Sequence, residues 1–277
     1  MSLPPGSSGA APPEADAPFL SVVIPAYNEA RRLPATLATV RAYLDARPYS
    51  AEILVVDDGS EDHTADLVEQ VAAADPRVRL IRNPHSGKGV AVRTGMLAAG
   101  GRFILYSDAD FSTPIEEIEK LLPWLEARGF DIAIGSREGK GARRIGEPAY
   151  RHFMGRIFNT AVRVIALRQF ADTQCGFKAF TRAATQDLFH RVQLYGDHAG
   201  PVKGARVTGF DVEVLYLALR RGYRVKEVPV KWVYYSGSKV SPIQDSIRLF
   251  WDVVKVRQND LQGKYRADTS PASRRRA

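Results

Sequence analysis

Short apolar runs alternate with longer segments of helical periodicity through the first half of this chain, and this alternation most constrains its fold. The first helical segment spans about 29–46, where leucine and valine recur every three or four residues. Apolar runs that alternate with helices indicate strands buried on both faces of a mostly parallel sheet. The predicted fold class is therefore α/β. The runs are Leu20–Ile24, Ile53–Val56, Val78–Ile81, Phe103–Tyr106 and Asp131–Gly135.

The second half is less regular. It predicts helices over about 148–168, 209–221 and 242–257, and a strand over 224–230. Residues 1–18 and 258–277 contain few large apolar side chains, and the second of these segments ends in a basic triplet, so both are predicted to be disordered tails. Residues 19–257 are predicted to form one domain, with a nucleotide-sugar half at 19–137 and an acceptor half at 138–257.

Three polar segments follow strands of the predicted sheet, at Pro25–Glu29, Asp57–Ser60 and Asp108–Asp110. In parallel α/β sheets the binding crevice lies beyond the carboxyl ends of the strands. We therefore expect these segments to meet at one edge and to form the functional site.

Asp108 and Asp110 are the most informative pair, because residues two apart on an extended chain lie on the same side. At a separation of about 7 Å, two like charges repel by roughly 2 kcal/mol at an effective dielectric near 20. A hard cation such as Mg²⁺ or Mn²⁺ that also holds a diphosphate would relieve this repulsion. The alternative is a solvated pair that caps the helix predicted to start near Ser112–Pro114.

Charge and composition narrow the classes of partner. The formal charge is +8, which favours an anionic partner, but aromatic residues are not interleaved with the basic ones as nucleic-acid stacking requires. We expect no nucleic-acid partner. Cys175 is the single cysteine, and no apolar stretch approaches the ~18 residues of a spanning helix, nor is a signal peptide evident.

Five motifs in order resemble the inverting family-2 glycosyltransferases, which have the Rossmann-like GT-A fold, and the resemblance covers about 19–257. In the second half, three further motifs resemble the dolichyl-phosphate β-glucosyltransferase branch. The first five are Val22–Glu29, Val55–Ser60, Gly87–Gly89, Asp108–Asp110 and Gly135–Arg137, and the other three are Asp172–Lys178, Phe210–Glu213 and Gly237–Lys239.

The resemblance implies a donor site. Pro25, Tyr27 and Glu29 would border the nucleotide, Val56 and Ala109 would line it, and Asp58 would accept a hydrogen bond from uracil N–H. Lys88 and Arg93 would contact the ligand, because they lie where a helix begins and its N–H groups favour an anion. The alternative is that Pro25 and Tyr27 only form a turn, that Asp58 is a helix N-cap and that Lys88 is a solvated loop residue.

The resemblance also implies the catalytic residues. Asp110 would bind the metal directly and Asp108 would lie nearer the ribose or act through water, with Mg²⁺ or Mn²⁺ as cofactor. Arg137 would lie near the phosphates, and Asp172 would orient the acceptor or polarise the site. Arg151 and Lys239 would hold the acceptor phosphate, whose anionic oxygens need no general base. Of Asp211 and Glu213, two apart on a predicted helix, one could be functional while the other packs.

The function expected is inverting transfer of glucose from UDP-glucose to dolichyl or polyprenyl phosphate. Alternatives are transfer of mannose or another hexose, transfer to a soluble glycan, or a non-catalytic nucleotide-sugar-binding module. Val233–Tyr235 departs from the arginine found there in mannosyl relatives, which favours the glucosyl branch. The basic aromatic helices at 148–168 and 242–257 predict peripheral attachment to the cytoplasmic face of a membrane, unless both only cover the sheet.

Overall fold

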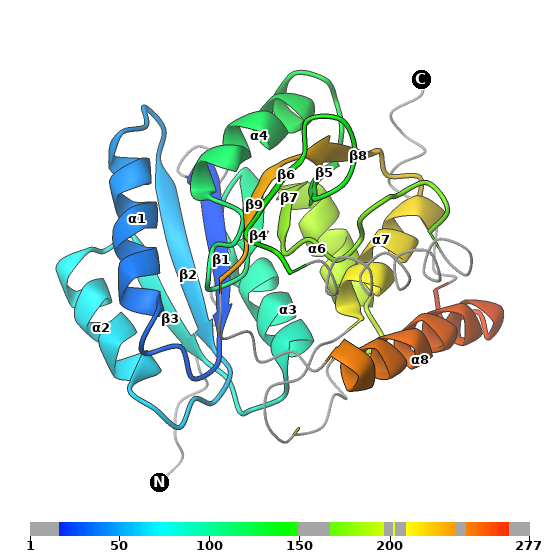
Figure 1. The fold of residues 1–277 in the computed structure, drawn as a ribbon, viewed down its shortest axis with the longest axis horizontal. Coiled ribbons are helices and arrows are strands. Elements are labelled where there is room, and N and C mark those ends of the chain that lie inside the picture. Colours follow the sequence, from blue (N-terminus) through cyan, green and yellow to red (C-terminus); the bar gives the residue numbers. More distant parts are fainter. Residues whose placement is uncertain (1–16, 149–166, 197–201, 203–208, 236–241, 266–277) are drawn as a thin grey trace, which may run out of the picture.

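A seven-stranded sheet forms the centre of the computed structural model (Figure 1), which describes residues 17–148, 167–196, 202, 209–235 and 242–265. The strand order is β3-β2-β1-β4-β7-β5-β8, and only β7 is antiparallel to its neighbours. A separate pair of short strands, β6 and β9, consists of Arg143–Ile145 and Lys231–Val233. The strands of the large sheet are β1 Leu20–Ala26, β2 Ala51–Asp57, β3 Val78–Arg82, β4 Phe103–Ser107, β5 Ile132–Ser136, β7 Phe177–Thr181 and β8 Val225–Pro229.

Helices cover both faces of this sheet, as predicted. Side chains of α3 (Lys88–Ala98), α6 (Arg182–Arg191), α7 (Phe210–Arg220) and α8 (Pro242–Leu261) enter one apolar core. Those of α1 (Leu33–Asp45), α2 (Thr64–Ala74), the short 3₁₀ turn η2 (Ile115–Glu117) and α4 (Ile118–Glu126) enter the other. Figure 1 shows the two layers on opposite sides of the strands.

Strand alternation explains why both layers are needed. Val23 and Val56 point into the core under α3, whereas Val22 and Val55 point into the core under α1. All four side chains are fully buried. A strand that is apolar at every position has no face that tolerates water, so the sheet must be covered twice.

The structure corrects two boundaries and adds a strand. The helix predicted from about 29 begins only at Leu33, because Asn28 adopts a left-handed conformation (φ 53°) and residues 29–32 form a turn. Strand β7 was not predicted, because Lys178 interrupts its apolar run. The folded part also continues past the predicted end at 257: α8 reaches Leu261, and Tyr265 is buried beneath it.

The remaining predicted elements are largely confirmed. The first five strands, the helix at 209–221 and the strand at 224–230 agree with the structure to within a few residues. Nearly all of the helix predicted at 148–168 lies outside the described residues. Within the described part of the chain, no helix combines the length and the apolar character needed to cross a bilayer.

The strand order places the site. Strand β1 lies between β2 and β4. From β1 the chain adds β2 and β3 on one side, and then crosses back to add β4 on the other side of β1. Crevices at such topological switch points bind ligands in α/β sheets. The segments after Ala26, Asp57 and Ser107 therefore converge at the same sheet edge, as the sequence predicted.

Candidate active site

The segments that follow β1 and β2 are joined by hydrogen bonds. Ala26 pairs with Asp57 in the ladder, the Asn28 amide donates to Ser60 Oγ at 2.9 Å, and the Glu29 amide donates to Thr64 Oγ1 at 2.8 Å. The structure therefore brings Tyr27 and Glu29 next to the Asp57–Ser60 turn. It confirms that these predicted donor residues lie together.

Asp58 has a role that the sequence did not reveal. Its buried carboxylate accepts hydrogen bonds from the Ser86 amide at 2.9 Å, the Gly87 amide at 2.8 Å and His85 Nδ1 at 2.9 Å. The alternative that Asp58 caps the next helix is wrong, because α2 begins only at Thr64. Asp58 instead fixes the loop between β3 and α3 against the end of β2.

Three of the residues predicted to line the nucleotide-sugar site contribute little exposed surface. Val56 is fully buried and packs against Gly95 of α3: a Cβ added to that glycine would lie 2.8 Å from Val56 Cγ2. The Val56 side chain therefore belongs to the core. The side chain of Ala109 packs into the core under α1, and its carbonyl accepts from Thr36 Oγ1 at 2.8 Å. Pro25 is also buried within β1. The side chains of Val56 and Ala109 therefore point inward, and only their backbone could line the nucleotide, as predicted for these two residues.

The acidic pair is partly exposed at the end of β4. Asp108 Oδ1 accepts from Lys88 Nζ at 2.7 Å and from the Tyr106 hydroxyl at 2.9 Å, and Asp110 Oδ1 accepts from the Ser112 amide at 2.9 Å. Neither aspartate caps a helix, since η2 begins at Ile115 after Pro114 and α4 begins at Ile118. The capping alternative is therefore wrong.

Burial and mutual repulsion both act on this acidic pair. Burial and the neighbouring charge of Asp108 raise the pKa of Asp110. Burial opposes the charge on Lys88, but Asp108 and Asp211 outweigh it and raise the lysine pKa. The charge of Lys88 thus acts on both carboxylates and that of Arg32 also interacts with Asp110, yet the pKa of Asp110 stays raised.

The donor set fits a hard divalent ion. Asp108 and Asp110 offer carboxylate oxygens, which Mg²⁺ and Mn²⁺ prefer. Among the described residues, no group of three or more histidine, cysteine, aspartate or glutamate side chains is placed to hold a metal by itself. An ion here would take its remaining ligands from a diphosphate and from water, as Mg²⁺ commonly does.

A buried ion pair lies beneath the acidic pair. Lys178 is 2% exposed, and its ammonium group donates to Asp211 and to the Cys175 carbonyl. Burial raises the pKa of Asp211, while Lys178 and Lys88 act against that shift. Sequence reasoning missed Lys178, although a lysine in the run Phe177–Phe180 is a signal, because a buried lysine requires a partner.

Gly176, the residue just before β7, lets the chain pass close to Asp108. A Cβ at Gly176 would lie 2.2 Å from Asp108 Oδ2, and the Asp108 amide donates to the Gly176 carbonyl at 3.1 Å. Any side chain at this position would displace the carboxylate.

The neighbouring residue Cys175 is a buried thiol. Burial raises the pKa of Cys175 to about 11, so its thiol stays protonated and unreactive near neutral pH.

Glu213 faces away from this cluster. Its carboxylate accepts from the Gln193 amide at 2.7 Å and from the Tyr265 hydroxyl at 2.7 Å. The two acids of α7 therefore point in different directions, as predicted. Asp211 lies under the candidate site, and Glu213 ties the end of the chain to the helical layer.

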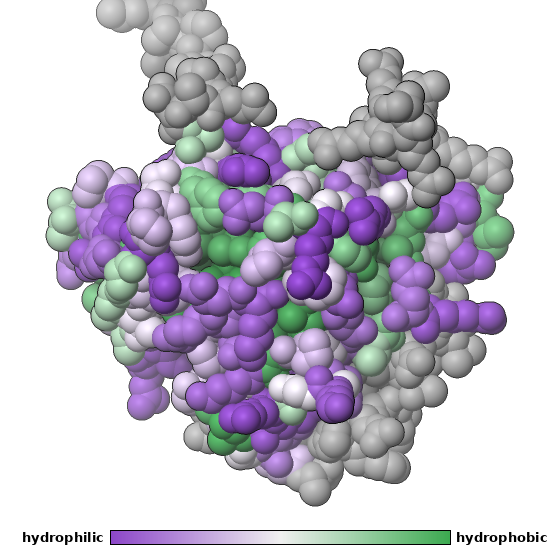
Figure 2. All heavy atoms as spheres, turned by 90° about the horizontal axis from the view of Figure 1, so that it is seen from above, coloured by the Kyte–Doolittle hydropathy of each residue, from purple (hydrophilic) through white to green (hydrophobic). Residues whose placement is uncertain are grey.

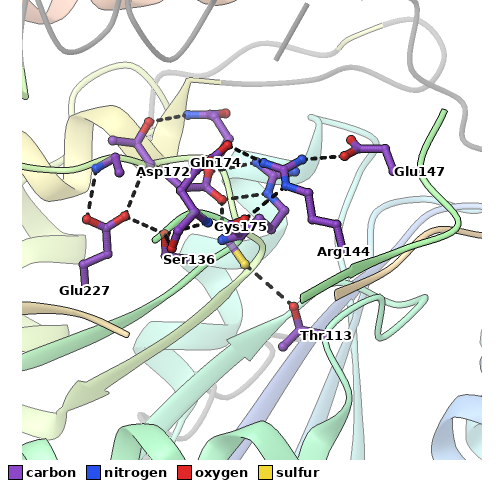
Figure 3. Close-up of polar contacts among 12 residues, drawn as sticks. Thr113, Ser136, Arg144, Glu147, Asp172, Gln174, Cys175 and Glu227 are labelled. Atoms are coloured by element: carbon purple, nitrogen blue, oxygen red, sulfur yellow. Dashed lines mark hydrogen bonds and ion pairs between the residues drawn. The ribbon is translucent and has the colours of Figure 1, made fainter. Parts of the chain in front are cut away.

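Arg137 and Asp172 form a second pair, in which the aspartate is fully buried and the arginine is 19% exposed. Figure 3 shows the surroundings of Asp172, with Glu227 and Ser136 nearby. Arg137 donates from Nε to Oδ2 at 2.7 Å, from Nη2 to Oδ1 at 2.8 Å, and from its amide to Oδ2 at 2.9 Å. Glu227 accepts from the Asp172 amide at 2.8 Å and from Ser136 Oγ at 2.7 Å. Arg144 Nε donates to the Arg137 carbonyl at 3.1 Å, which fixes the backbone of the pair.

This pairing excludes Asp172 as a general base. Burial alone would raise its pKa, but the charge and hydrogen bonds of Arg137 outweigh burial and hold the pKa of Asp172 well below its usual range. The side chain is 0% exposed and cannot touch a substrate. The structure thus corrects the prediction that Asp172 is catalytic: it positions Arg137. Arg151 and Lys239, the predicted acceptor-phosphate ligands, lie outside the described residues.

Comparison with known proteins agrees with this architecture. Residues 21–189 match the family described as Glycosyl transferase family 2. The chain is 34% identical over 260 residues to a dolichyl-phosphate beta-glucosyltransferase of Dictyostelium discoideum, and the match covers 88% of this chain and 76% of that protein. It is 36% identical over 263 residues to a protein of the same name from Drosophila melanogaster, with 89% and 77% covered.

A solved structure shares the fold. Glucosyl-3-phosphoglycerate synthase from Mycobacterium tuberculosis, in complex with Mn²⁺, UDP-glucose and phosphoglyceric acid, superimposes with a TM-score of 0.60 at 16% identity. The superposition covers 93% of this chain and 83% of that chain. Together with the family match over most of the central sheet, this shows that the chain is a glycosyltransferase of the GT-A fold and belongs to glycosyl transferase family 2.

Proposed function

We propose that this enzyme transfers glucose from UDP-glucose to dolichyl or polyprenyl phosphate, with inversion at the sugar carbon. The observation that carries the proposal is the acidic pair Asp108 and Asp110, which lies partly exposed at the switch point of the sheet. The names of the relatives support glucose and a dolichyl phosphate. The Mn²⁺ and UDP-glucose complex of a protein with the same fold supports a metal-bound UDP-sugar.

The donor would lie along the converging loops. In this proposal Tyr27 stacks on the uracil ring, Asp58 accepts its ring N–H, and Lys88 exchanges Asp108 for the diphosphate. Asp108 and Asp110 would hold Mg²⁺ or Mn²⁺, which when bound neutralises the charge that develops on the leaving nucleoside diphosphate.

The acceptor is inferred from what the candidate bases can do. A sugar hydroxyl acceptor would need a general base. Asp172 is enclosed by Arg137, and Asp211 is held by Lys178, so both candidate acids are committed to buried ion pairs. A lipid phosphate is already anionic and needs only to be positioned, which would be the role of Arg137, Arg151 and Lys239. This supports a phosphate acceptor over a soluble glycan.

We also propose that α8 seats the protein peripherally on the cytoplasmic face of a membrane. Phe250, Trp251 and Leu261 are 40%, 57% and 79% exposed. Exposed basic residues flank them, namely Arg248, Lys255 and Arg257 on the same helix and Lys264 in the turn that follows it. Exposed aromatic side chains between cations suit the interface of an anionic bilayer, where each cation adds about 1 kcal/mol.

The opposite end of the molecule offers less for such a contact. Seen from above, the surface is mostly polar, and hydrophobic side chains show only in scattered patches (Figure 2). Helix α8 lies at the other end in Figure 1. The proposal therefore assigns the membrane contact to α8.

The activity is tested with the purified full chain, a panel of UDP- and GDP-sugars, Mg²⁺ or Mn²⁺, and a short-chain polyprenyl phosphate. We expect a β-linked glucosyl phospholipid by mass spectrometry and NMR, formed only with UDP-glucose and a divalent ion. Asp110→Ala should lower turnover by about 10²–10³-fold, the typical effect of losing one stabilising group at a developing charge. The exposed Asp66→Ala serves as the control. Undiminished turnover in Asp110→Ala would contradict the proposal, and a mannosyl product would replace the donor assignment.

The membrane contact has its own test. Trp251→Ser and Lys255→Glu should each reduce co-sedimentation with vesicles that contain phosphatidylserine, without changing turnover on a detergent-solubilised acceptor. Ile145→Ser is the matched control, since Ile145 is 46% exposed on β6. Equal sedimentation of all variants would remove α8 from the membrane proposal.

A further inference from the structure

His85 already makes the two contacts that the proposed base site would offer to uracil. Its imidazole stacks on the Tyr27 ring with the centroids 4.0 Å apart and the planes 8° from parallel. Its Nδ1 lies 2.9 Å from Asp58 Oδ2 and 2.9 Å from the Asp58 carbonyl. The side chain is 19% exposed, so it is lodged in the site.

The chemistry of these contacts resembles that of a nucleobase. A carboxylate and a carbonyl can only accept hydrogen bonds, so His85 Nδ1 carries a proton and donates it. The histidine therefore presents a flat aromatic ring stacked on a tyrosine, with a ring N–H directed at an aspartate. Uracil would present the same face and the same kind of donor to Tyr27 and Asp58.

We propose that His85 stands in for the nucleobase in the unliganded enzyme and must leave Tyr27 before the base can bind. This inference rests on the proposed function, because it takes Tyr27 and Asp58 as the base contacts. It adds that His85 competes for these contacts and so lowers the apparent affinity for the nucleotide.

The surrounding hydrogen bonds allow the exchange. Asp58 also accepts from the Ser86 and Gly87 amides, so the loop backbone stays attached when the imidazole leaves. Gly87 has φ 94°, a conformation that favours glycine and lets the loop turn sharply beside the carboxylate. The uracil ring would replace the imidazole on Tyr27, and its N3–H would replace Nδ1–H at Asp58. Little interaction energy is therefore lost when the base and the imidazole exchange.

Competition of this kind has a measurable cost. The apparent dissociation constant is the intrinsic one divided by the fraction of molecules in which the site is open. A base with no ring N–H at this position cannot replace the histidine donor. Uracil has one at N3, and cytosine does not. That difference acts on the intrinsic affinity of each base for Asp58. The open fraction is the same for both nucleotides, so His85 should weaken the binding of UDP and of CDP by the same factor.

The test is titration calorimetry of the full chain with UDP and with CDP, in the presence of Mn²⁺. His85→Ala should lower the dissociation constant for UDP about threefold to tenfold, which corresponds to an open fraction of roughly 0.1–0.3 in the wild type. His85→Phe keeps the ring on Tyr27 and should bind UDP more weakly than His85→Ala. His63→Ala is the control, because His63 is exposed and pairs with Asp66 away from the site. Circular dichroism melting confirms that each variant is folded.

The outcomes separate the two proposals. Tighter UDP binding by His85→Ala, with an equal gain for CDP, supports the inference. Unchanged or weaker UDP binding by that variant overturns it, since His85 would then be neutral or a wall of the site. If neither the wild type nor the variant binds UDP, the proposed function fails together with the inference.

Discussion

Two acid–cation pairs flank the active site, and they differ in how tightly each is held. Lys88 and Asp108 are 35% and 36% exposed, and one ammonium contact joins them. Arg137 and Asp172 are 19% and 0% exposed, and two side-chain hydrogen bonds and a backbone amide join them. The first pair can exchange partners with a ligand, whereas the second cannot without leaving a buried charge unpaired.

The difference teaches which acid meets the substrate. A metal or phosphate ligand must accept new partners, so it stays near solvent with a flexible lysine as its temporary partner. A positioning residue must keep its geometry, so it is enclosed and paired with the planar guanidinium of arginine. Both acids stood out in the sequence, but only their burial separates these roles.

The largest effect is expected from breaking the enclosed pair. Asp172→Asn should lower the free energy of unfolding by about 3–5 kcal/mol, because Arg137 stays buried without a counter-charge. Urea denaturation at neutral pH measures this loss. The double variant Asp172→Asn with Arg137→Met should recover part of it, since both charges are then absent. A single variant as stable as the wild type would show that the pair is not structural.

Asp110→Asn should produce the opposite pattern. Turnover should fall by about 10²–10³-fold, while the free energy of unfolding stays equal or rises, because burial and Asp108 raise the pKa of Asp110 and so make its charge costly in the folded state. Paired measurements of turnover and urea denaturation check this. A large loss of stability would place Asp110 with the enclosed pair instead.

Gly176→Ala tests the support beneath the exposed pair. The new methyl group would overlap the Asp108 carboxylate, so Mn²⁺ affinity in the presence of UDP should fall by about tenfold or more, as for other changes next to metal ligands. Electron paramagnetic resonance of bound Mn²⁺ reports this directly. Thr181→Ala is the control, because it removes the N-cap of α6 at the far end of the same strand. Equal Mn²⁺ affinity in both variants would contradict the steric argument.

The smallest effect concerns pH. Arg137 holds the folded-state pKa of Asp172 below that of the unfolded chain, which is about 3.9. The stability gained from the pair is therefore complete above about pH 4 and is lost as the pH falls toward the folded-state pKa. The difference in unfolding free energy between the wild type and Asp172→Asn should shrink below pH 4. A constant difference from pH 3 to pH 7 would show that ionisation of Asp172 does not stabilise the fold.

Much of this protein could be predicted from the sequence alone. Apolar runs alternating with helices determined the α/β fold and the helices on both faces, because a strand apolar at every position must be buried on both sides. The polar segments after β1, β2 and β4 determined the edge where the site lies. They did so because parallel strands bring their carboxyl ends together.

Tertiary structure decided what each site residue does. Asp172 holds Arg137 and the Val56 side chain points into the core, although both stand in motifs that favour ligand contact. Asp58 holds a loop in addition to its proposed contact with the base. Lys178 and the His85 stack on Tyr27 were not foreseen, because each depends on a partner distant in the sequence. Sequence spacing sets which residues share a strand or an edge. Burial and charge partners arise only when separate elements pack, and these determine whether an acid binds a ligand or supports the residue that does.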